Sequence, residues 1–165
     1  MPTVTLKYPH SVLEVLRLRP QDLLELRLSR RVPHESWQAV VEAAQQARAR
    51  VKVVAGETRG GGRRGDDKEG RAGTAEAVVR EREPLDLRDL WEGARERHGL
   101  WLALDQIQDP HNLGAIFRTA AFFGVRGIVL TKHKSAPLTA TAYDVASGGV
   151  EHVPCALATN LRQAL

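Results

Sequence analysis

The fold of the second half of this chain is decided by residues 100–130, which read LWLALDQIQDPHNLGAIFRTAAFFGVRGIVL. The nearly all-apolar run Leu100–Leu104 is typical of a strand in a buried parallel sheet. A polar turn follows, and the apolar spacing after it predicts a helix with Asn112 as its N-cap. Gly124 suits the left-handed position after a helix end, and a second apolar strand follows over Gly127–Leu130. Strand, helix and strand in this order predict a βαβ unit of an α/β fold.

An isolated arginine, Arg118, stands in this helix, and we expect it to be buried among apolar and small residues. Its charge then needs a partner or a ligand. The helix N-terminus at Asn112 favours an anion, and Gly114, one turn before Arg118, leaves room for a substrate or another backbone. Spacing alone leaves two interpretations open. One is a pocket for a phosphate or an oxyanion, and the other is a plain cap at Asn112 with an Arg118–Asp109 ion pair.

Ligands of parallel sheets bind beyond the carboxyl ends of the strands. The turn Gln106–His111 is expected there, and so is the turn after Leu130, which contains Lys132, His133, Lys134 and Ser135. The sequence shows no Gly-rich phosphate loop, no Ser/His/Asp constellation and no metal-binding pair, so we predict a site without a metal ion.

Composition sets broad limits on function. The chain has 165 residues, with 24 Lys and Arg against 20 Asp and Glu, a net charge of +4. This mild basic excess fits a nucleic-acid partner without requiring one. A single cysteine, Cys155, excludes an internal disulfide. No apolar run has the length of a membrane span, and the N-terminus lacks a signal pattern, so we expect a cytoplasmic protein with no membrane partner.

Two domains are predicted along the chain. Residues 1–80 indicate a small α/β domain, with strands over Leu23–Leu28 and Val51–Val54 and helices capped by Ser11 and Ser36. Residues 81–98 are highly charged and predict a linker with a short surface helix. Residues 99–165 then form the second domain.

Residues 57–73 differ sharply from the rest of the first domain. From Thr58 to Arg71 the chain has no apolar residue, which predicts a flexible loop that cannot bury a core. One interpretation is an Arg/Gly segment that contacts RNA. The other is a solvated surface insertion, favoured by the acidic residues Asp66, Asp67 and Glu69.

The segment Leu102–Val125 resembles the first signature motif of the SpoU/TrmH RNA 2′-O-ribose methyltransferases. The three parts of that motif stand here as Asp109-Pro110-His111-Asn112-Leu113-Gly114-Ala115, Arg118-Thr119-Ala120 and Phe123-Gly124-Val125. The likeness continues through Ser135-Ala136, residues 146–154 and Thr159-Asn160-Leu161. Within the family, the chain most resembles the branch that methylates a guanosine of large-subunit ribosomal RNA.

The resemblance implies an α/β fold with a small N-terminal RNA substrate-binding domain over residues 1–80. Residues 99–165 would be the first part of an α/β-knot (SPOUT) methyltransferase domain. It implies transfer of a methyl group from S-adenosylmethionine to a ribose of ribosomal RNA, by a homodimer in the full-length family member. Arg118 and Asn112 are then the expected catalytic residues. Gly114, His111 and Ser135 are the expected substrate-binding residues.

The sequence also departs from the family pattern. Pro9 stands where the family usually has Gly, and the His-Gln-Gly stretch usual near residues 72–74 is lacking. The family motifs that build the cofactor pocket, the knot and the dimer interface lie beyond the point that matches Leu165. We therefore expect a C-terminally truncated chain whose cofactor-binding residues are unassigned. A catalytically incompetent RNA-binding fragment is the main alternative, and a small-molecule α/β enzyme without a Gly-rich loop is a weaker one.

Overall fold

The structure is a computed structural model that describes residues 1–29, 35–54, 75–92 and 98–165. The chain forms two compact units, Met1–Glu81 and Arg82–Leu165. The loop predicted over residues 57–73 lies outside the described residues. No described helix is long and apolar enough to cross a membrane.

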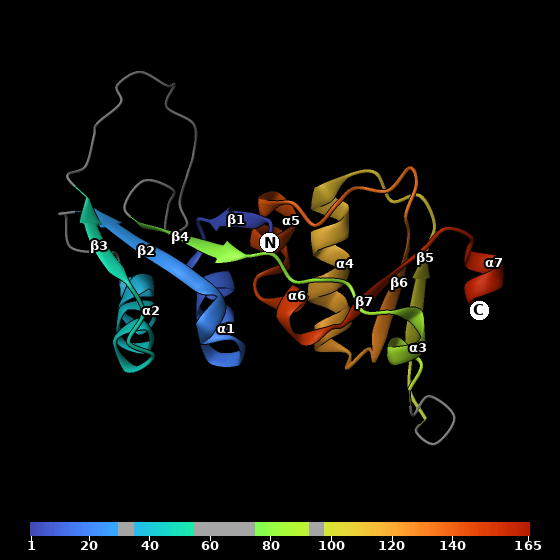
Figure 1. The fold of residues 1–165 in the computed structure, drawn as a ribbon, viewed down its shortest axis with the longest axis horizontal. Coiled ribbons are helices and arrows are strands. Elements are labelled where there is room, and N and C mark those ends of the chain that lie inside the picture. Colours follow the sequence, from blue (N-terminus) through green and yellow to red (C-terminus); the bar gives the residue numbers. More distant parts are fainter. Residues whose placement is uncertain (30–34, 55–74, 93–97) are drawn as a thin grey trace. The chain divides into compact units, whose positions relative to one another are not determined.

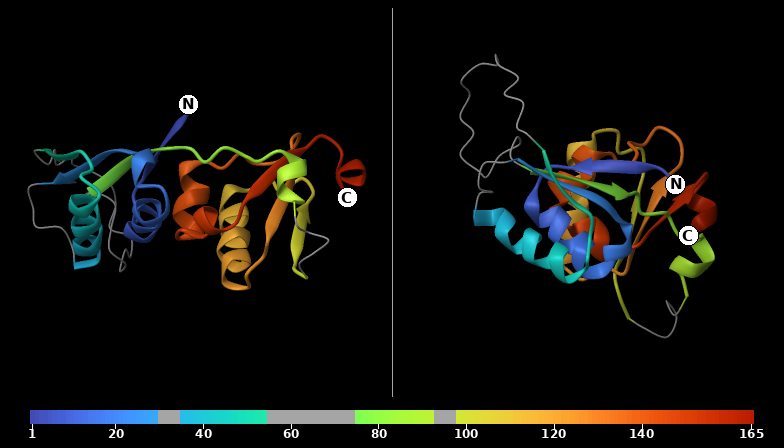
Figure 2. Two further views of the ribbon diagram at one scale, coloured as in Figure 1. Left: turned by 60° about the horizontal axis from the view of Figure 1, so that its bottom comes forward. Right: turned by 60° about the vertical axis from the view of Figure 1, so that its left-hand side comes forward.

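The first unit is a four-stranded sheet with two helices on one side of it (Figures 1 and 2). Its elements are β1 (Thr3–Leu6), α1 (Pro9–Leu18), a 3-10 turn η1 (Pro20–Asp22), β2 (Leu23–Ser29), α2 (Glu35–Gln46), β3 (Val51–Val54) and β4 (Ala75–Arg80). The strand order is β1-β4-β2-β3, in which only the β2–β3 pair is parallel. Side chains of β4 alternate between buried and half-buried, so one face of the sheet packs into the core.

The core of the first unit lies between this sheet and the two helices. Trp37 and Val40 of α2 are fully buried, as are Val12 and Val15 of α1 and Leu26 of β2. The helix predicted near Ser36 is thereby confirmed as α2. The predicted caps are wrong, because α1 begins at Pro9 and α2 at Glu35, which places Ser11 and Ser36 inside the helices.

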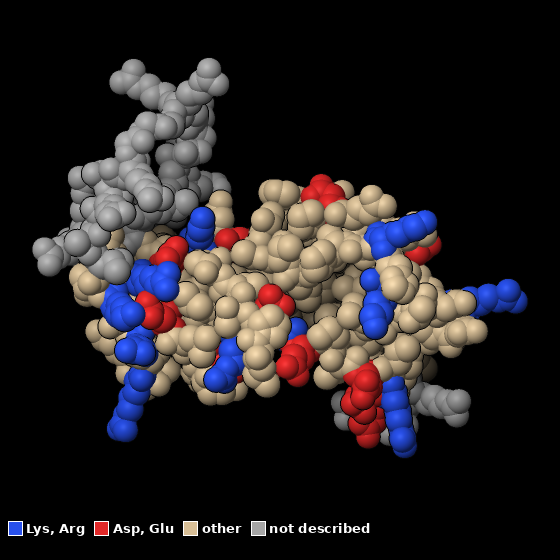
Figure 3. All heavy atoms as spheres, turned by 45° about the horizontal axis from the view of Figure 1, so that its top comes forward, with Lys and Arg blue, Asp and Glu red and all other residues tan. Residues whose placement is uncertain are grey.

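The opposite face of this sheet carries charges that neutralise one another. Arg27 bonds Glu25 and Glu76 at 2.7 and 2.9 Å, and Lys52 bonds Glu25 at 3.0 Å. On the face of the molecule shown in Figure 3, the described Lys and Arg side chains are likewise interspersed with Asp and Glu. Among the described residues of these faces, the positive charges are therefore largely offset by negative ones.

The second unit contains a three-stranded parallel sheet in the order β5-β6-β7. Its elements are α3 (Leu87–Leu90), β5 (Trp101–Leu104), α4 (Pro110–Phe122), β6 (Gly127–Thr131), α5 (Ala140–Ala146), α6 (Gly149–His152), β7 (Cys155–Ala158) and α7 (Leu161–Ala164). The βαβ unit predicted from residues 100–130 is thus confirmed as β5–α4–β6. Gly124 has a φ of 65°, as its predicted left-handed position requires.

Helices cover both faces of this sheet (Figure 2, left). On one face, Leu90 of α3 packs with Val129, Ala156 and Ala158, and α7 adds Leu161 and Ala164. On the other, α4 packs against α5 and α6 through a fully buried stripe that includes Leu113 and Phe117. The central strand β6 is therefore buried on both sides.

Two expectations about this unit need correction. The strand at Leu100–Leu104 was expected to be buried, but β5 is an edge strand with half-buried side chains, and Leu100 is 54% exposed. The short helix expected within residues 81–98 forms as α3, but residues 82–92 pack in the second unit instead of at its surface. There the Leu85 amide donates to the Cys155 carbonyl at 2.7 Å, and Leu90 is buried in the core.

Candidate functional site

The N-terminus of α4 is built by an Asp-Pro pair. Asp109 is the N-cap, and its Oδ1 accepts a hydrogen bond from the His111 amide at 2.9 Å. Pro110 occupies the first helical position, where its fixed φ favours the helix and its missing amide proton costs nothing. The sequence predicted Asn112 as the cap, and this prediction is wrong. Asn112 is an exposed residue of the first turn.

Arg118 lies on the exposed part of α4, which corrects the expectation of a buried arginine. The buried stripe of the helix consists of Leu113, Gly114, Phe117 and Ala120, so the Arg118 side chain projects beside it rather than into it. Within the described part of the chain, Arg118 makes no ion pair, and the Arg118–Asp109 pair considered from spacing does not form. The guanidinium is thus available to an anionic ligand.

The expected site residues of α4 do not all share a face. At about 100° per residue, His111 and Arg118 are seven residues apart and lie along one exposed line, roughly 10 Å apart along the axis. Asn112 lies about 120° around the helix from Arg118. One substrate molecule that contacts both Asn112 and Arg118 therefore has to reach around the helix. Otherwise the two residues that it contacts come from two different copies of the protein.

Gly114 serves packing rather than direct contact with a substrate. A Cβ at this buried position would lie 2.5 Å from the Ala142 carbonyl oxygen and 2.8 Å from Cβ of Val145. The space that the glycine leaves is filled by the backbone of α5, the second of the two possibilities raised by the sequence. Gly149 has the same function on the other side, since its Cβ would lie 2.7 Å from the Phe117 carbonyl and 2.8 Å from Cα of Arg118.

Ser135 belongs to a hydrogen-bonded connection between the turns after β5 and β6. The hydroxyls of Thr131 and Ser135 lie 2.6 Å apart, and Thr131 also accepts from the Gln106 amide at 2.9 Å. The Ala136 amide donates to the Ile107 carbonyl at 2.7 Å. These bonds fix the two turns relative to each other at the carboxyl edge of the sheet.

A cleft of about 430 Å³ opens at this edge. It is lined by residues that follow all three strands, namely Asp105, Gln106, Thr131, His133, Lys134, Thr159, Asn160, Leu161 and Arg162. The sequence predicted ligand binding at the carboxyl ends of the strands, and His133 and Lys134 were placed there. The expected site residues His111, Asn112, Gly114, Arg118 and Ser135 are not among the lining residues.

Sequence reasoning missed the contribution of β7 to this cleft. Thr159, Asn160 and Arg162 directly follow that strand, but only the pairing of β7 with β6 brings them to the same edge. Asn160 caps the short α7 by accepting from the Arg162 amide at 3.0 Å. The available signal was the apolar run before Thr159, which marks a further parallel strand.

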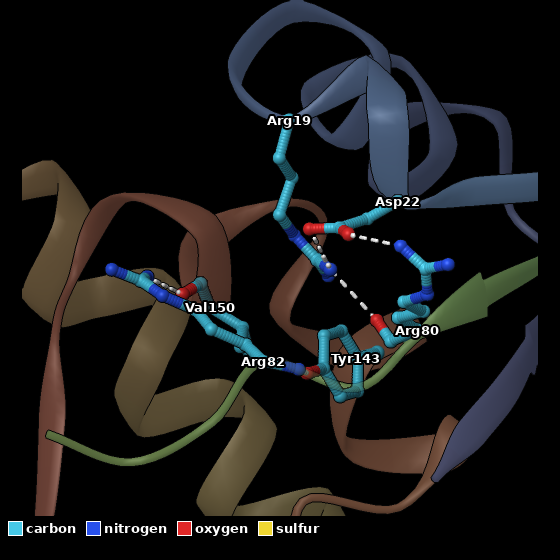
Figure 4. A network of polar contacts seen from close by, with 6 residues as sticks. All are labelled: Arg19, Asp22, Arg80, Arg82, Tyr143 and Val150. Carbon is cyan, nitrogen blue, oxygen red and sulfur yellow. Dashed lines mark hydrogen bonds and ion pairs between the residues drawn. The ribbon is translucent and has the colours of Figure 1, made fainter. Parts of the chain in front are cut away.

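Two arginine clusters stabilise the ends of their units (Figure 4). In the first unit, Arg19 donates to the Arg80 carbonyl at 2.7 Å and pairs with Asp22, which also pairs with Arg80. In the second unit, Arg82 donates from its guanidinium to the carbonyls of Val150 and Val153, and from its amide to the Tyr143 hydroxyl at 2.7 Å. The Arg82 side chain thus satisfies carbonyls at the C-terminal end of α6, which packs on α4 beside Arg118.

The same region holds the only cysteine of the chain. Cys155 is buried at the start of β7, and burial raises the pKa of its thiol to about 11, although the charge of Arg82 opposes the shift. A neutral buried thiol is a poor nucleophile, so Cys155 has a packing role.

Comparison with known proteins shows what this chain is similar to. Residues 99–165 match the SpoU rRNA Methylase family. The 23S rRNA (guanosine-2′-O-)-methyltransferase RlmB of Acinetobacter baylyi is 35% identical over 162 residues, covering 94% of this chain and 62% of that protein. RlmB of Nitrosomonas europaea is 45% identical over 93 residues, covering 56% of this chain and 35% of that protein. The chain thus spans between about a third and two thirds of the length of these relatives.

Solved structures agree on the fold. The SpoU methyltransferase AviRb of Streptomyces viridochromogenes, solved with AdoMet, superposes with a TM-score of 0.70 at 15% identity, covering 98% of this chain and 56% of that one. An AdoMet-bound rRNA methyltransferase of Sinorhizobium meliloti gives 0.62 at 22% identity, covering 94% and 54%. Residues 99–165, which contain the signature residues 109–125 and the parallel sheet that they connect, thus match the SpoU rRNA Methylase family, and the solved structures share their fold.

Proposed function

We propose that the protein to which this chain belongs transfers a methyl group from S-adenosylmethionine to a ribose 2′-hydroxyl of ribosomal RNA, on a guanosine of 23S rRNA. The observation that carries the proposal is the family match over residues 99–165, in which Arg118 is exposed and without an ion pair in the described chain. The names of the two RlmB relatives support the choice of nucleotide.

Arg118 acts electrostatically in this proposal. A ribose hydroxyl is a poor nucleophile until it loses proton density, and a guanidinium stays protonated in proteins, so Arg118 does not serve as the base. It binds a substrate phosphate through its planar fork and stabilises the alkoxide that develops as the hydroxyl gives its proton to water and takes the methyl group, which leaves S-adenosylhomocysteine. Asn112 is the second catalytic candidate, because its exposed amide can orient the ribose.

The roles proposed for His111 and Ser135 follow from their positions, and only His111 contacts the substrate directly. His111 lies on the same exposed line of α4 as Arg118 and can contact the RNA backbone next to the phosphate that Arg118 binds. Ser135 acts through its hydrogen bond to Thr131, which holds the turn after β6 in place. Gly114 contributes to the substrate site only by allowing α5 to pack closely on α4.

The described residues supply the substrate side of the reaction. S-adenosylmethionine provides the methyl group and carries a positive sulfonium. The cleft at the carboxyl edge does not fit it, because Lys134 and Arg162 would place two further positive charges around that cation. The cofactor is therefore expected outside this cleft.

We also propose that the protein forms a homodimer. Phe122 and Phe123 at the end of α4 are 84% and 69% exposed, and such an apolar pair next to Arg118 supports a homodimer formed through this helix.

The alignment with A. baylyi RlmB over 94% of the chain supports a role for residues 1–80 as the RNA substrate-binding domain. We assign the protein to the cytoplasm, where ribosomal RNA is modified.

The test is methyl transfer from radiolabelled S-adenosylmethionine to 23S rRNA by the full-length protein. Methylation of the 2′-hydroxyl is read as resistance of one phosphodiester bond to alkaline cleavage. Arg118→Gln should lower the rate about 10²–10³-fold, the usual cost of removing one donor to a developing oxyanion. Arg118→Lys should lose most of that rate, because an ammonium cannot reproduce the bidentate geometry.

Arg126→Gln is the matched control, because Arg126 is exposed at the amino end of β6, away from the carboxyl edge of the sheet. It should leave the rate unchanged. A nearly normal rate for Arg118→Lys would show that bidentate binding is not the function of Arg118. RNA binding without methyl transfer in the full-length protein would instead favour the non-catalytic alternative.

A further inference from the structure

The cleft at the carboxyl edge of the β5-β6-β7 sheet has no function in the proposed reaction. Its volume of about 430 Å³ is within the range of roughly 300–1,000 Å³ of small-ligand sites. Residues from three separate turns line it, and two of these turns are fixed to each other by the bonds among Gln106, Thr131 and Ser135. The cleft is therefore preformed by the fold rather than left between loose loops.

The charge of the lining is positive. Residues 99–165 contain five Lys and Arg side chains, and two of them, Lys134 and Arg162, line the cleft together with His133. Asp105 is the one carboxylate in the lining. Neither Lys134 nor Arg162 makes an ion pair within the described residues, so their charges are open to a ligand. An anion is the ligand that this arrangement favours.

The backbone of the lining also departs from ordinary conformations. Gln106 and Lys134 have φ values of 54° and 58°, a left-handed backbone conformation that residues other than glycine rarely adopt. They stand in the turns after β5 and β6 and both line the cleft. Such strained residues concentrate at functional sites, where the surrounding structure holds them in place.

We propose that this cleft binds a phosphodiester and base of single-stranded RNA, at a nucleotide next to the one that is methylated. The inference rests on the proposed function, which supplies RNA as the substrate. Lys134 and Arg162 contact the phosphate. The amides of Gln106 and Asn160 and the carboxylate of Asp105 offer donors and acceptors to an unpaired base. A single strand is required because the Watson–Crick edges of bases in an A-form duplex are occupied by pairing.

The probe for a test is a fluorescently labelled single-stranded RNA of twelve nucleotides, and its affinity for the full chain is measured by anisotropy between 50 and 300 mM KCl. Each lost phosphate contact should reduce the slope of log K against log salt by about 0.7. Lys134→Gln and Arg162→Gln should each show this reduction and bind several-fold more weakly at 100 mM KCl. Arg162→Lys keeps the charge and should retain the slope, whereas a misfolded variant would not.

Arg126→Gln again serves as the control and should bind as the wild type does. Unchanged slopes in both cleft variants overturn the proposal, and so does an equal loss in the control. Uridine 5′-monophosphate should compete only weakly, and competition at the affinity of the RNA would identify a mononucleotide pocket instead. The methyl-transfer assay separates the two proposals: normal methylation with unchanged slopes rejects the cleft alone, whereas reduced slopes without methylation reject the reaction alone.

Discussion

At the scale of single residues, Gly149 determines how closely α6 approaches α4 at Arg118. A methyl group at Gly149 would meet the Phe117 carbonyl at 2.7 Å and Cα of Arg118 at 2.8 Å. Gly149→Ala should therefore force α6 away from α4 and destabilise the second unit by about 1–3 kcal/mol, as overpacking does. The measurement is urea unfolding followed by circular dichroism.

Gly124→Asn is the matched control for this substitution. No atom lies within 4 Å of the Cβ position at Gly124, and asparagine tolerates its positive φ, so the cost should stay below about 1 kcal/mol. Wild-type stability of Gly149→Ala would mean that α4 and α6 can separate without loss. The position of Arg118 would then not depend on this contact.

The buried thiol of Cys155 makes the free energy of unfolding depend on pH, with a definite sign. Burial raises the pKa of its thiol to about 11 from a usual value near 9. The unfolded chain therefore loses this proton at lower pH than the folded chain. The stabilisation is complete below about pH 9 and is lost as the pH rises through about 11, by roughly 2–3 kcal/mol.

The measurement is the free energy of unfolding of the wild type and of Cys155→Ala at pH 8 and pH 10.5. Lysines and tyrosines titrate in both proteins, so the difference between the two isolates the thiol. The wild type should lose more stability than the variant over this range. Equal losses of stability in the two proteins would show that the thiol is not buried. As a second check, a thiol-specific reagent should react slowly at pH 8 until the protein is unfolded.

At the scale of elements, the short helix α3 shows where the second unit begins. Leu90 is 5% exposed and packs with Val129, Ala156 and Ala158, although its charged surroundings in the sequence predicted a linker. Leu90→Ala should cost about 2–4 kcal/mol, in the range of leucine truncations in a core. Thermal and urea unfolding of the full chain measure this cost.

Leu85→Ala provides the comparison within the same segment. Leu85 is 41% exposed, and its amide bond to the Cys155 carbonyl survives the substitution, so the loss should be below about 1 kcal/mol. Equal and small losses for both leucines would restore the linker interpretation for residues 82–92.

The central elements of the second unit were predictable because they carry strong signals. The apolar run at Gly127–Leu130 gave β6, and the apolar stripe with Gly124 gave α4 and its end. The helix starts were predicted wrongly, since both α1 and α4 begin with a proline at the first position. Proline pre-sets the helical φ there, and this signal outweighs a serine or asparagine a few residues later.

The candidate site was only partly predictable for a different reason. Arg118 and its neighbours could be identified from the local pattern, but their exposure depends on which side of α4 contacts α5 and α6. The cleft depends on the strand order β5-β6-β7, which brings Gln106, Lys134 and Arg162 together from distant parts of the chain. No periodicity in the sequence specifies that order.

At the scale of the whole molecule, the proposed RNA affinity depends on how many Lys and Arg side chains contact phosphates. The net charge of +4 is small, and charges of both signs are interspersed on the face shown in Figure 3. Three cations, Arg118, Lys134 and Arg162, are candidates for phosphate contacts on the second unit. Three contacts with a single strand correspond to a slope of log K against log salt of about −2.

A steeper slope, near −4 or beyond, would require further cations, and the sequence offers them within residues 57–73. Arg63 and Arg64 lie in that stretch, which was interpreted either as an RNA-contacting segment or as a solvated insertion beside Asp66 and Asp67. Because the nearby carboxylates offset these arginines, we expect Arg63→Gln/Arg64→Gln to bind the twelve-nucleotide RNA with the slope of the wild type. A slope reduced by about 1.4 in this double variant would instead show that both arginines contact phosphates, and that the first unit adds RNA contacts of its own through this segment.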